Sequence, residues 1–151
     1  MKAVVQRVKR SSVNVHGTVH SSISEGILVL LGVHEEDSER DAEFLADKCA
    51  ALRIFDDGSG RMNLSVKDTG GSALVVSQFT LYGDARKGNR PNYMEAAKPE
   101  QAERLYLHFV ERLGRNIGIE RVSTGIFREM MDVELVNDGP VTIIIETREH
   151  D

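Results

Sequence analysis

Apolar and polar positions along the first third of the chain predict strands. Residues 3–8 (AVVQRV) are rich in β-branched side chains and alternate in polarity, and residues 12–15 and 18–23 have the pattern of a hairpin. Residues 26–33 (GILVLLGV) are apolar at nearly every position, which is typical of a strand that is buried on both faces. The sequence therefore predicts a sheet with 26–33 near its centre.

Two later segments have the 3.6-residue period of a helix that packs on a core. Asp37-Ser38 followed by Asp41 predicts the start of the first helix, whose apolar stripe would comprise Phe44, Leu45, Cys49 and Leu52. Pro99-Glu100 predicts the start of the second, whose apolar face would comprise Ala102, Leu105, Tyr106, Phe109, Val110 and Leu113. Cys49 is thus expected in the core, as a packing residue and not a nucleophile.

Further strands are expected at 73–81 (ALVVSQFTL), 133–136 and 141–146. Blocks of strands with two helices between them differ from the regular alternation of a doubly wound sheet. The pattern predicts an α+β fold, with a mixed or antiparallel sheet curled around a core and the helices on one side. No repeat or linker divides residues 1–151, so we expect a single domain.

Composition and net charge argue against several functional classes. The chain has 151 residues and a net charge of −5, which argues against a broad surface that coats nucleic acid. Arg86, Lys87 and Arg90 form the densest basic cluster, which is either a solvated loop or a local site. The longest apolar runs are too short to span a bilayer, Met1-Lys2 leads into a strand without a signal-peptide pattern, and the single cysteine permits no internal disulfide. These features predict a cytoplasmic protein without membrane partners.

Familiar catalytic and metal motifs are missing from the sequence. It has no Gly-x-Ser-x-Gly elbow, no phosphate-binding Gly-Lys-Ser/Thr loop and no His-Glu-x-x-His pair. The histidines share no spacing typical of metal ligands; they stand at positions 16, 20, 34, 108 and 150. We therefore expect neither a metal site nor a cofactor.

The stretch SQFTLYGD, residues 77–84, ends an apolar strand with polar side chains. Buried polar groups at a strand end need hydrogen-bond partners, so Ser77, Gln78 and Thr80 either cap loops or form the floor of a small pocket. Thr80 is a conceivable nucleophile, but a threonine hydroxyl needs an activating base, and none is identifiable nearby in the sequence.

The stretch LVNDGPVTIII, residues 135–145, has the pattern of two strands joined by a turn. Asn, Asp and Gly are common turn residues. Pro140, however, stands where the second strand should begin to pair, and proline has no backbone donor. Gly139-Pro140 is therefore either a simple turn or a rigid backbone segment with a function other than turning the chain.

Together these motifs resemble the D-aminoacyl-tRNA deacylase family. The resemblance rests on SQFTLYGD, on the loop KGNRPNY (87–93), on NDGPVT (137–142) and on the opening MKAVVQRV, and it covers essentially the whole chain. Two positions depart from the common pattern. Arg128-Glu129 stands where many members have Gly-Ala, and Tyr93 stands where Phe is frequent.

The resemblance implies a barrel-like α+β homodimer with active sites at the dimer interface. Its reaction is hydrolysis of the ester that joins a D-amino acid to the 3′-terminal adenosine of tRNA, a proofreading step of translation. The residues implied as lining the catalytic pocket are Ser77, Gln78, Phe79 and Thr80. Gly139-Pro140 would be a Gly-cisPro motif inserted into the partner subunit's pocket, with Arg7 as its brace, and Phe127 and Ala102 would hold the adenosine end.

The same resemblance implies a mechanism. The carbonyl groups of Gly139-Pro140 would accept hydrogen bonds from the substrate ammonium group, an L side chain would overlap this backbone, and glycyl-tRNA would be admitted. Backbone donors and the ribose 2′-hydroxyl would assist the reaction. The alternatives are a Thr80 nucleophile, a non-catalytic module that binds the tRNA 3′ end, and an esterase acting on small D-amino acid esters.

Overall fold

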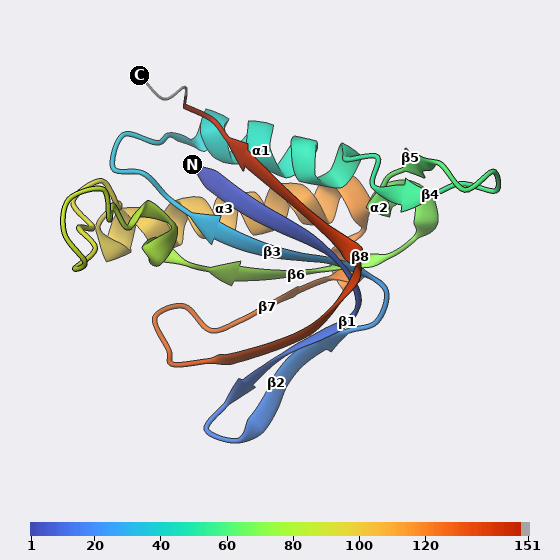
Figure 1. The fold of residues 1–151 in the computed structure, drawn as a ribbon, viewed down its shortest axis with the longest axis horizontal. Helices are drawn as coiled ribbons and strands as arrows, with labels where there is room; N and C mark the ends of the chain where they lie inside the picture. Colours follow the sequence, from blue (N-terminus) through green and yellow to red (C-terminus); the bar gives the residue numbers. More distant parts are fainter. Residues whose placement is uncertain (149–151) are drawn as a thin grey trace.

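A computed structural model describes residues 1–148 and shows a long, curled mixed sheet (Figure 1). One edge of β1 (Lys2–Val15) pairs antiparallel with β3 (Gly26–Gly32) along its first half and with β2 (Thr18–Ile23) along its second half. The other edge of β1 pairs antiparallel with β8 (Asp132–Glu146). β1 is therefore an interior strand of the sheet, with partners along both of its edges.

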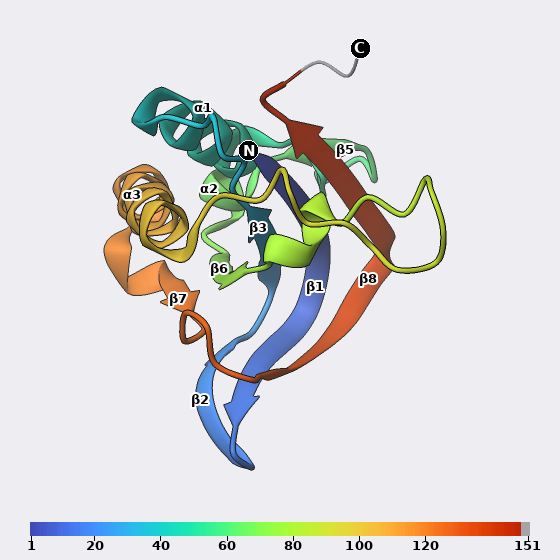
Figure 2. The same ribbon diagram turned by 90° about the vertical axis from the view of Figure 1, so that its left-hand side faces the viewer.

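The remaining strands of this sheet run parallel to one another. β6 (Ser72–Ser77) pairs with β3, and β7 (Val122–Thr124) pairs with β6, both in parallel register. The other elements are short: β4 (Phe55–Asp56), β5 (Met62–Leu64), α2 (Val66–Thr69), η1 (Phe79–Tyr82) and η2 (Ile119–Arg121). Curvature brings the sheet into the nearly closed form visible in Figure 2.

Two long helices lie side by side over one face of the sheet (Figures 1 and 2). α1 (Glu39–Ala51) begins with a capping box in which the Ser38 N–H donates to Asp41 Oδ2 at 2.8 Å. α3 (Pro99–Ile117) begins with Pro99 in its first turn. Arg112 of α3 donates to Asp47 of α1 at 2.8 Å, so polar contacts join the two helices along their exposed side.

The core lies between these helices and the sheet. Its strands contribute Val5, Ile27, Val29, Leu31 and Val75, and its helices contribute Leu45, Cys49, Leu105, Phe109 and Leu113. The expected α+β fold with a curled, barrel-like sheet and two main helices is confirmed, as is the packing role of Cys49. Among residues 1–148, no helix is long and apolar enough to cross a membrane.

Three expectations were wrong in detail. Residues 73–81 do not form one strand, because β6 ends at Ser77 and the chain turns into η1. Residues 133–136 and 141–146 are not separated by a turn, since β8 continues from one to the other along β1. Phe44 lies outside the core and is 50% exposed, on the solvent side of α1 next to Lys48.

Candidate active site

The end of β6 presents the polar segment as an exposed helical turn. The Gln78 N–H still donates to Leu31 O of the neighbouring strand at 2.8 Å, and η1 begins at the next residue. This change of direction leaves Phe79 57% exposed and Thr80 at the surface. The Gln78 side-chain amide donates to the Thr80 hydroxyl. Because an amide has no useful basicity, this partner does not activate Thr80 as a nucleophile.

An aromatic pair borders this turn. The Phe79 and Tyr93 rings meet edge to face, with centroids 5.2 Å apart. Gly83 permits this approach, since a Cβ there would lie 2.9 Å from Tyr93 Cε1 and 3.0 Å from Thr80 O. The loop that ends at Tyr93 is therefore packed against η1, and the exposed face of Phe79 is available to a ligand or a second chain.

Arg7 links β1 to the Gly-Pro segment of β8. Its side chain is almost buried, with 9% of the residue exposed. Its Nε–H donates to Asp138 O at 2.8 Å and its Nη1–H donates to Ile54 O at 2.7 Å. Carboxylates of Asp56 and Asp138 lie 3.7 and 3.8 Å away. A buried cation with these partners is satisfied, and it fixes the carbonyl that precedes Gly139.

Gly139-Pro140 is a cis peptide and lies exposed in a bulge of β8. The Asn137 side chain spans the bulge, where its Oδ1 accepts from the Val141 N–H at 2.7 Å and its Nδ2 donates to Val141 O at 3.3 Å. Gly139 has φ +141°, and a Cβ there would lie 2.8 Å from Val141 Cγ2. Side chains on both sides thus hold an exposed backbone segment.

The two candidate halves of the site are far apart within one chain. Ser77 is level with Leu31 and Ala3 in the sheet, whereas Gly139 lies beside Arg7. The offset is four residues along β1, or about 13 Å, and three strand spacings across the sheet, or about 14 Å. One chain therefore does not bring Gly139-Pro140 to Ser77–Thr80.

Phe127, expected with Ala102 at the adenosine end, packs against the core cluster that contains Ala102. The Phe127 ring is half-buried and lies 6.0 Å from the ring of Tyr106, whose hydroxyl donates to Val75 O at 2.9 Å. Ala102 is 8% exposed and belongs to the core, so it offers a ligand little surface. Arg128 adopts φ +68° and is exposed beside Phe127.

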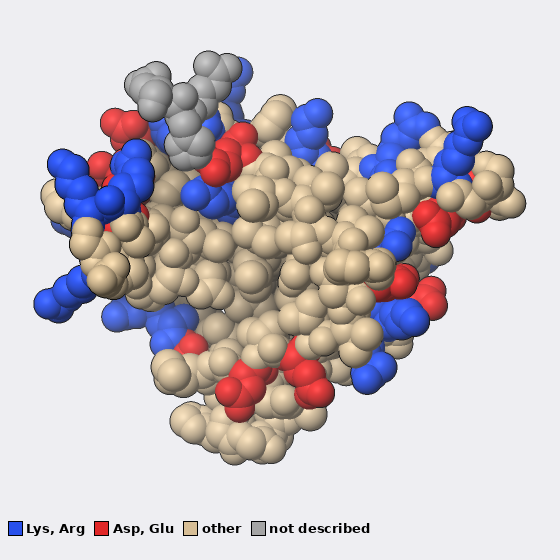
Figure 3. Space-filling view, viewed as in Figure 1, with Lys and Arg blue, Asp and Glu red and all other residues tan. Residues whose placement is uncertain are grey.

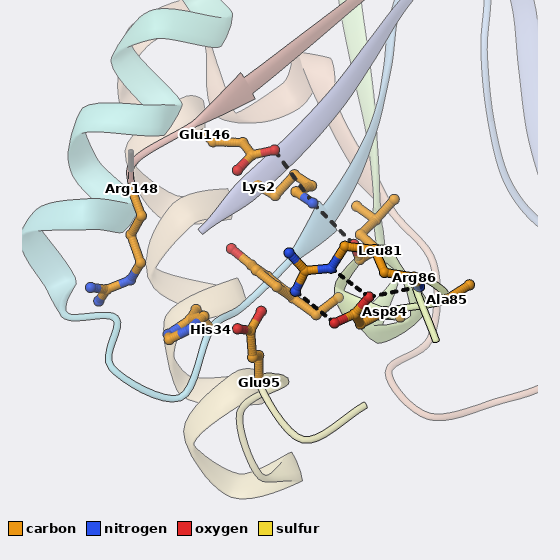
Figure 4. A pocket seen from close by; sticks show the side chains of 11 residues that line it. Lys2, His34, Leu81, Asp84, Ala85, Arg86, Glu95, Glu146 and Arg148 are labelled. Atoms are coloured by element: carbon orange, nitrogen blue, oxygen red, sulfur yellow. Dashed lines mark hydrogen bonds and ion pairs between the residues drawn. The ribbon is translucent and has the colours of Figure 1, made fainter. Parts of the chain in front are cut away.

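Sequence reasoning missed a charged cleft beside η1 (Figure 4). Its volume is about 740 Å³, and both cations and carboxylates line it. Lys2 Nζ donates to Leu81 O at 3.2 Å and lies 3.4 Å from Glu146, while Arg86 pairs with Asp84 at 2.7 Å. The Arg86 hydrogen bonds lower the pKa of Asp84 to about 2. The sequence motifs reached only the segment 81–86, because the other lining residues, such as Lys2, Glu95 and Glu146, are distant in the chain and meet only in the fold.

A second cavity of about 740 Å³ lies behind Arg7, next to Asp138 and the Gly70-Gly71 turn. Between residues 1 and 148, no three His, Cys, Asp or Glu side chains gather as a metal site would require. His150 lies outside the described residues.

The candidate site of this small α+β protein thus has two parts, namely the polar segment that follows β6 and the Gly139-Pro140 segment that Arg7 braces. The chain belongs to the D-Tyr-tRNA(Tyr) deacylase family, whose sequence model matches residues 4–146. The resemblance noted in the motifs is thereby confirmed.

Similar proteins support this assignment over the full chain. D-aminoacyl-tRNA deacylases of Koribacter versatilis and Anaeromyxobacter dehalogenans are 56% and 58% identical to it over 148 residues, 98% of this chain and of each relative. A solved structure titled c-Myc DNA Unwinding Element Binding Protein is 45% identical, covers 99% of this chain and 100% of its own, and has a TM-score of 0.94. A probable eukaryotic D-amino acid tRNA deacylase shares the fold at 14% identity, covering 95% of this chain and 97% of its own, with a TM-score of 0.83.

Proposed function

We propose that the protein hydrolyses the ester of D-aminoacyl-tRNA and releases the D-amino acid and free tRNA. The observation that carries the proposal is the exposed Gly139-Pro140 segment, held by Arg7 and by the Asn137 side chain. A rigid exposed backbone of this kind is suited to recognition by shape, and the curated relatives bear the name of this activity. Such a proofreading enzyme acts where tRNA is charged, in the cytoplasm.

The active unit in this proposal is a homodimer. Within one chain Gly139-Pro140 is remote from Ser77–Thr80, so a second copy supplies it to the pocket. Apolar side chains are exposed on both partners of that contact, namely Phe79 on η1 and Ile144, 63% exposed, on the outward face of β8. Burying such groups favours association.

Chiral selection follows from the backbone of the inserted segment. The substrate ammonium group donates hydrogen bonds to its carbonyl oxygens while the ester lies at η1. An L side chain then points into the Gly139-Pro140 backbone, which Arg7 keeps from moving aside, and the overlap excludes it. Glycine has no side chain to overlap, so glycyl-tRNA is also a substrate.

The chemistry needs no side-chain nucleophile. A water oxygen bonds to the ester carbonyl carbon, the bond from that carbon to O3′ breaks, and O3′ takes up a proton. The first N–H groups of a helical turn have no acceptor within it, which makes those of Phe79 and Thr80 candidate donors to the developing oxyanion. The neighbouring ribose 2′-hydroxyl assists the proton transfer. Phe127 borders the adenosine.

The test compares D-tyrosyl-tRNA, L-tyrosyl-tRNA and glycyl-tRNA in single-turnover hydrolysis. We expect rapid release from the D and glycyl substrates and none above background from the L substrate. Protection of the D ester would instead identify a module that only binds the tRNA end. Equal turnover of D-tyrosine methyl ester would identify an esterase of small esters, and hydrolysis of the L substrate would overturn the proposed selection.

A further inference from the structure

The loop that follows η1 has free cations beside the candidate pocket. Its base is closed by paired backbone hydrogen bonds of 2.8 Å between Asp84 and Asn92, and Gly88 at φ +74° turns its tip. Arg86 is neutralised by Asp84, since Nε and Nη2 both donate to that carboxylate, at 2.9 and 2.7 Å. Lys87 and Arg90 are exposed and take part in none of the ion pairs found within residues 1–148. We call residues 85–91 the basic loop.

The basic loop differs from other charged parts of the surface because it lies next to the candidate pocket. Figure 3 shows Lys and Arg side chains gathered at the end of the molecule where Figure 1 places this loop. The chain as a whole has a net charge of −5, so this is a local positive region on an acidic protein. Both ends of the loop adjoin the candidate pocket, through η1 on one side and through the Phe79–Tyr93 contact on the other.

We propose that Lys87 and Arg90 bind backbone phosphates of the RNA next to its reactive 3′ end. This inference rests on the proposed function, because the ester bound at η1 determines where the RNA continues. A loop of seven residues closed at its base reaches at most about 12 Å outward. One strand of a duplex presents a charge about every 3.4 Å, so two or three phosphates fall within this reach.

Phosphate contacts of this kind supply affinity without reading bases. The loop therefore raises the affinity for any aminoacylated tRNA, and the selection of the amino acid is left to the pocket. A short ester that lacks phosphates gains nothing from the loop. The alternative is a solvated loop whose charges only aid solubility.

The test replaces both free cations, as Lys87→Gln with Arg90→Gln, and measures kcat/KM across a range of salt concentrations. With D-tyrosyl-tRNA we expect a loss of about tenfold or more at low salt and a salt dependence shallower by about two charges. With 3′-O-D-tyrosyl-adenosine, which has no phosphate, we expect no change. Lys87→Arg with Arg90→Lys keeps both charges and should keep the tRNA activity.

The matched control removes one lysine and one arginine elsewhere, as Arg61→Gln with Lys67→Gln. These residues lie near β5 and α2, at the opposite end of the molecule (Figure 1), and the control should retain the wild-type salt dependence. An equal loss in the control, or an unchanged salt dependence in the loop variant, would overturn the proposal while the enzyme remained active. If the wild type hydrolysed neither ester, the proposed function would fail and this inference with it.

Discussion

At the scale of single residues, Arg7 is a nearly buried cation in the candidate site and needs hydrogen-bond acceptors around it. Its guanidinium donates hydrogen bonds to the carbonyl oxygens of Ile54 and Asp138, which are far apart in the chain. The sequence predicted that this cation needs partners, because Val5 and Val8 on either side are core residues. It did not predict the contact with Ile54, since that contact depends on where the segment after α1 lies relative to β1.

We expect Arg7→Ala to lower kcat/KM for D-tyrosyl-tRNA by about a hundredfold, because a displacement of about 1 Å in a positioning group has effects of that size. The free energy of unfolding should fall by about 1–3 kcal/mol, the usual effect of leaving buried carbonyl groups without donors. Arg10→Ala, an exposed arginine of the same strand, is the control and should alter neither quantity. Full activity in Arg7→Ala would remove Arg7 from the site.

Thr80 separates two chemical mechanisms. If backbone donors and the ribose 2′-hydroxyl perform the reaction, Thr80→Ala and Thr80→Val should retain most of the turnover, and a tRNA ending in 2′-deoxyadenosine should react much more slowly with the wild type. The hydrogen bond from the Gln78 amide favours this outcome. Complete loss of turnover in both variants, with folding intact and an acyl-enzyme trapped on the wild type, would establish Thr80 as the nucleophile.

Cys49 provides a residue-scale test of the core. Burial raises the pKa of its thiol to about 12, so at pH 8 only about one molecule in ten thousand has a thiolate there. We expect no alkylation by iodoacetamide over hours in the native protein and rapid alkylation in denaturant. Reaction at a rate independent of denaturant would show that α1 does not cover Cys49 as described.

At the scale of elements, the pattern of apolar residues predicted most strands but misplaced two boundaries. The pattern predicts a turn at 137–140 between two strands, yet β8 continues through it because register shifts near Arg7 absorb the extra residues. The strand predicted at 73–81 is too long because Phe79 and Leu81 are apolar, although they lie in η1. The pattern of apolar residues does not directly show a bulge or a helical turn, since the place where a strand bulges or ends depends on its pairing with the neighbouring strand.

The parallel pairing of β3 with β6 requires a close approach at Gly26. A Cβ at this position would overlap the Ser72 carbonyl oxygen, so Gly26→Ala must push β6 away from β3. We expect the free energy of unfolding to fall by more than about 2 kcal/mol, as for other substitutions that force backbone shifts in a packed core. Gly58→Ala, at a turn with open space around it, is the control and should be neutral in chemical denaturation. A neutral Gly26→Ala would contradict the β3–β6 register.

At the scale of the whole molecule, the proposed site depends on a contact between two chains. The sequence motifs identified both halves, Ser77–Thr80 and Gly139-Pro140, but nothing in their spacing along the chain shows that they lie on different strands of one sheet. That separation follows from the strand order, in which β3 and β1 lie between β6 and β8. The motifs therefore indicated the parts of the site, and the fold indicates that one chain does not assemble them.

Mixed dimers test this directly, because an interface with twofold symmetry exchanges each half of the site between subunits. One chain has a damaged pocket, Gln78→Ala with Phe79→Ala, and the other a damaged insert, Arg7→Ala with Pro140→Ala. If Gly139-Pro140 enters the partner's pocket, the mixed dimer has one site with both halves intact and one with both damaged. We expect dimers purified through two different tags to show about half the wild-type hydrolysis of D-tyrosyl-tRNA, whereas each damaged homodimer is nearly inactive. If each site used its own chain's insert, every site in the mixed dimer would have one damaged half, and the mixture would be as inactive as its parents.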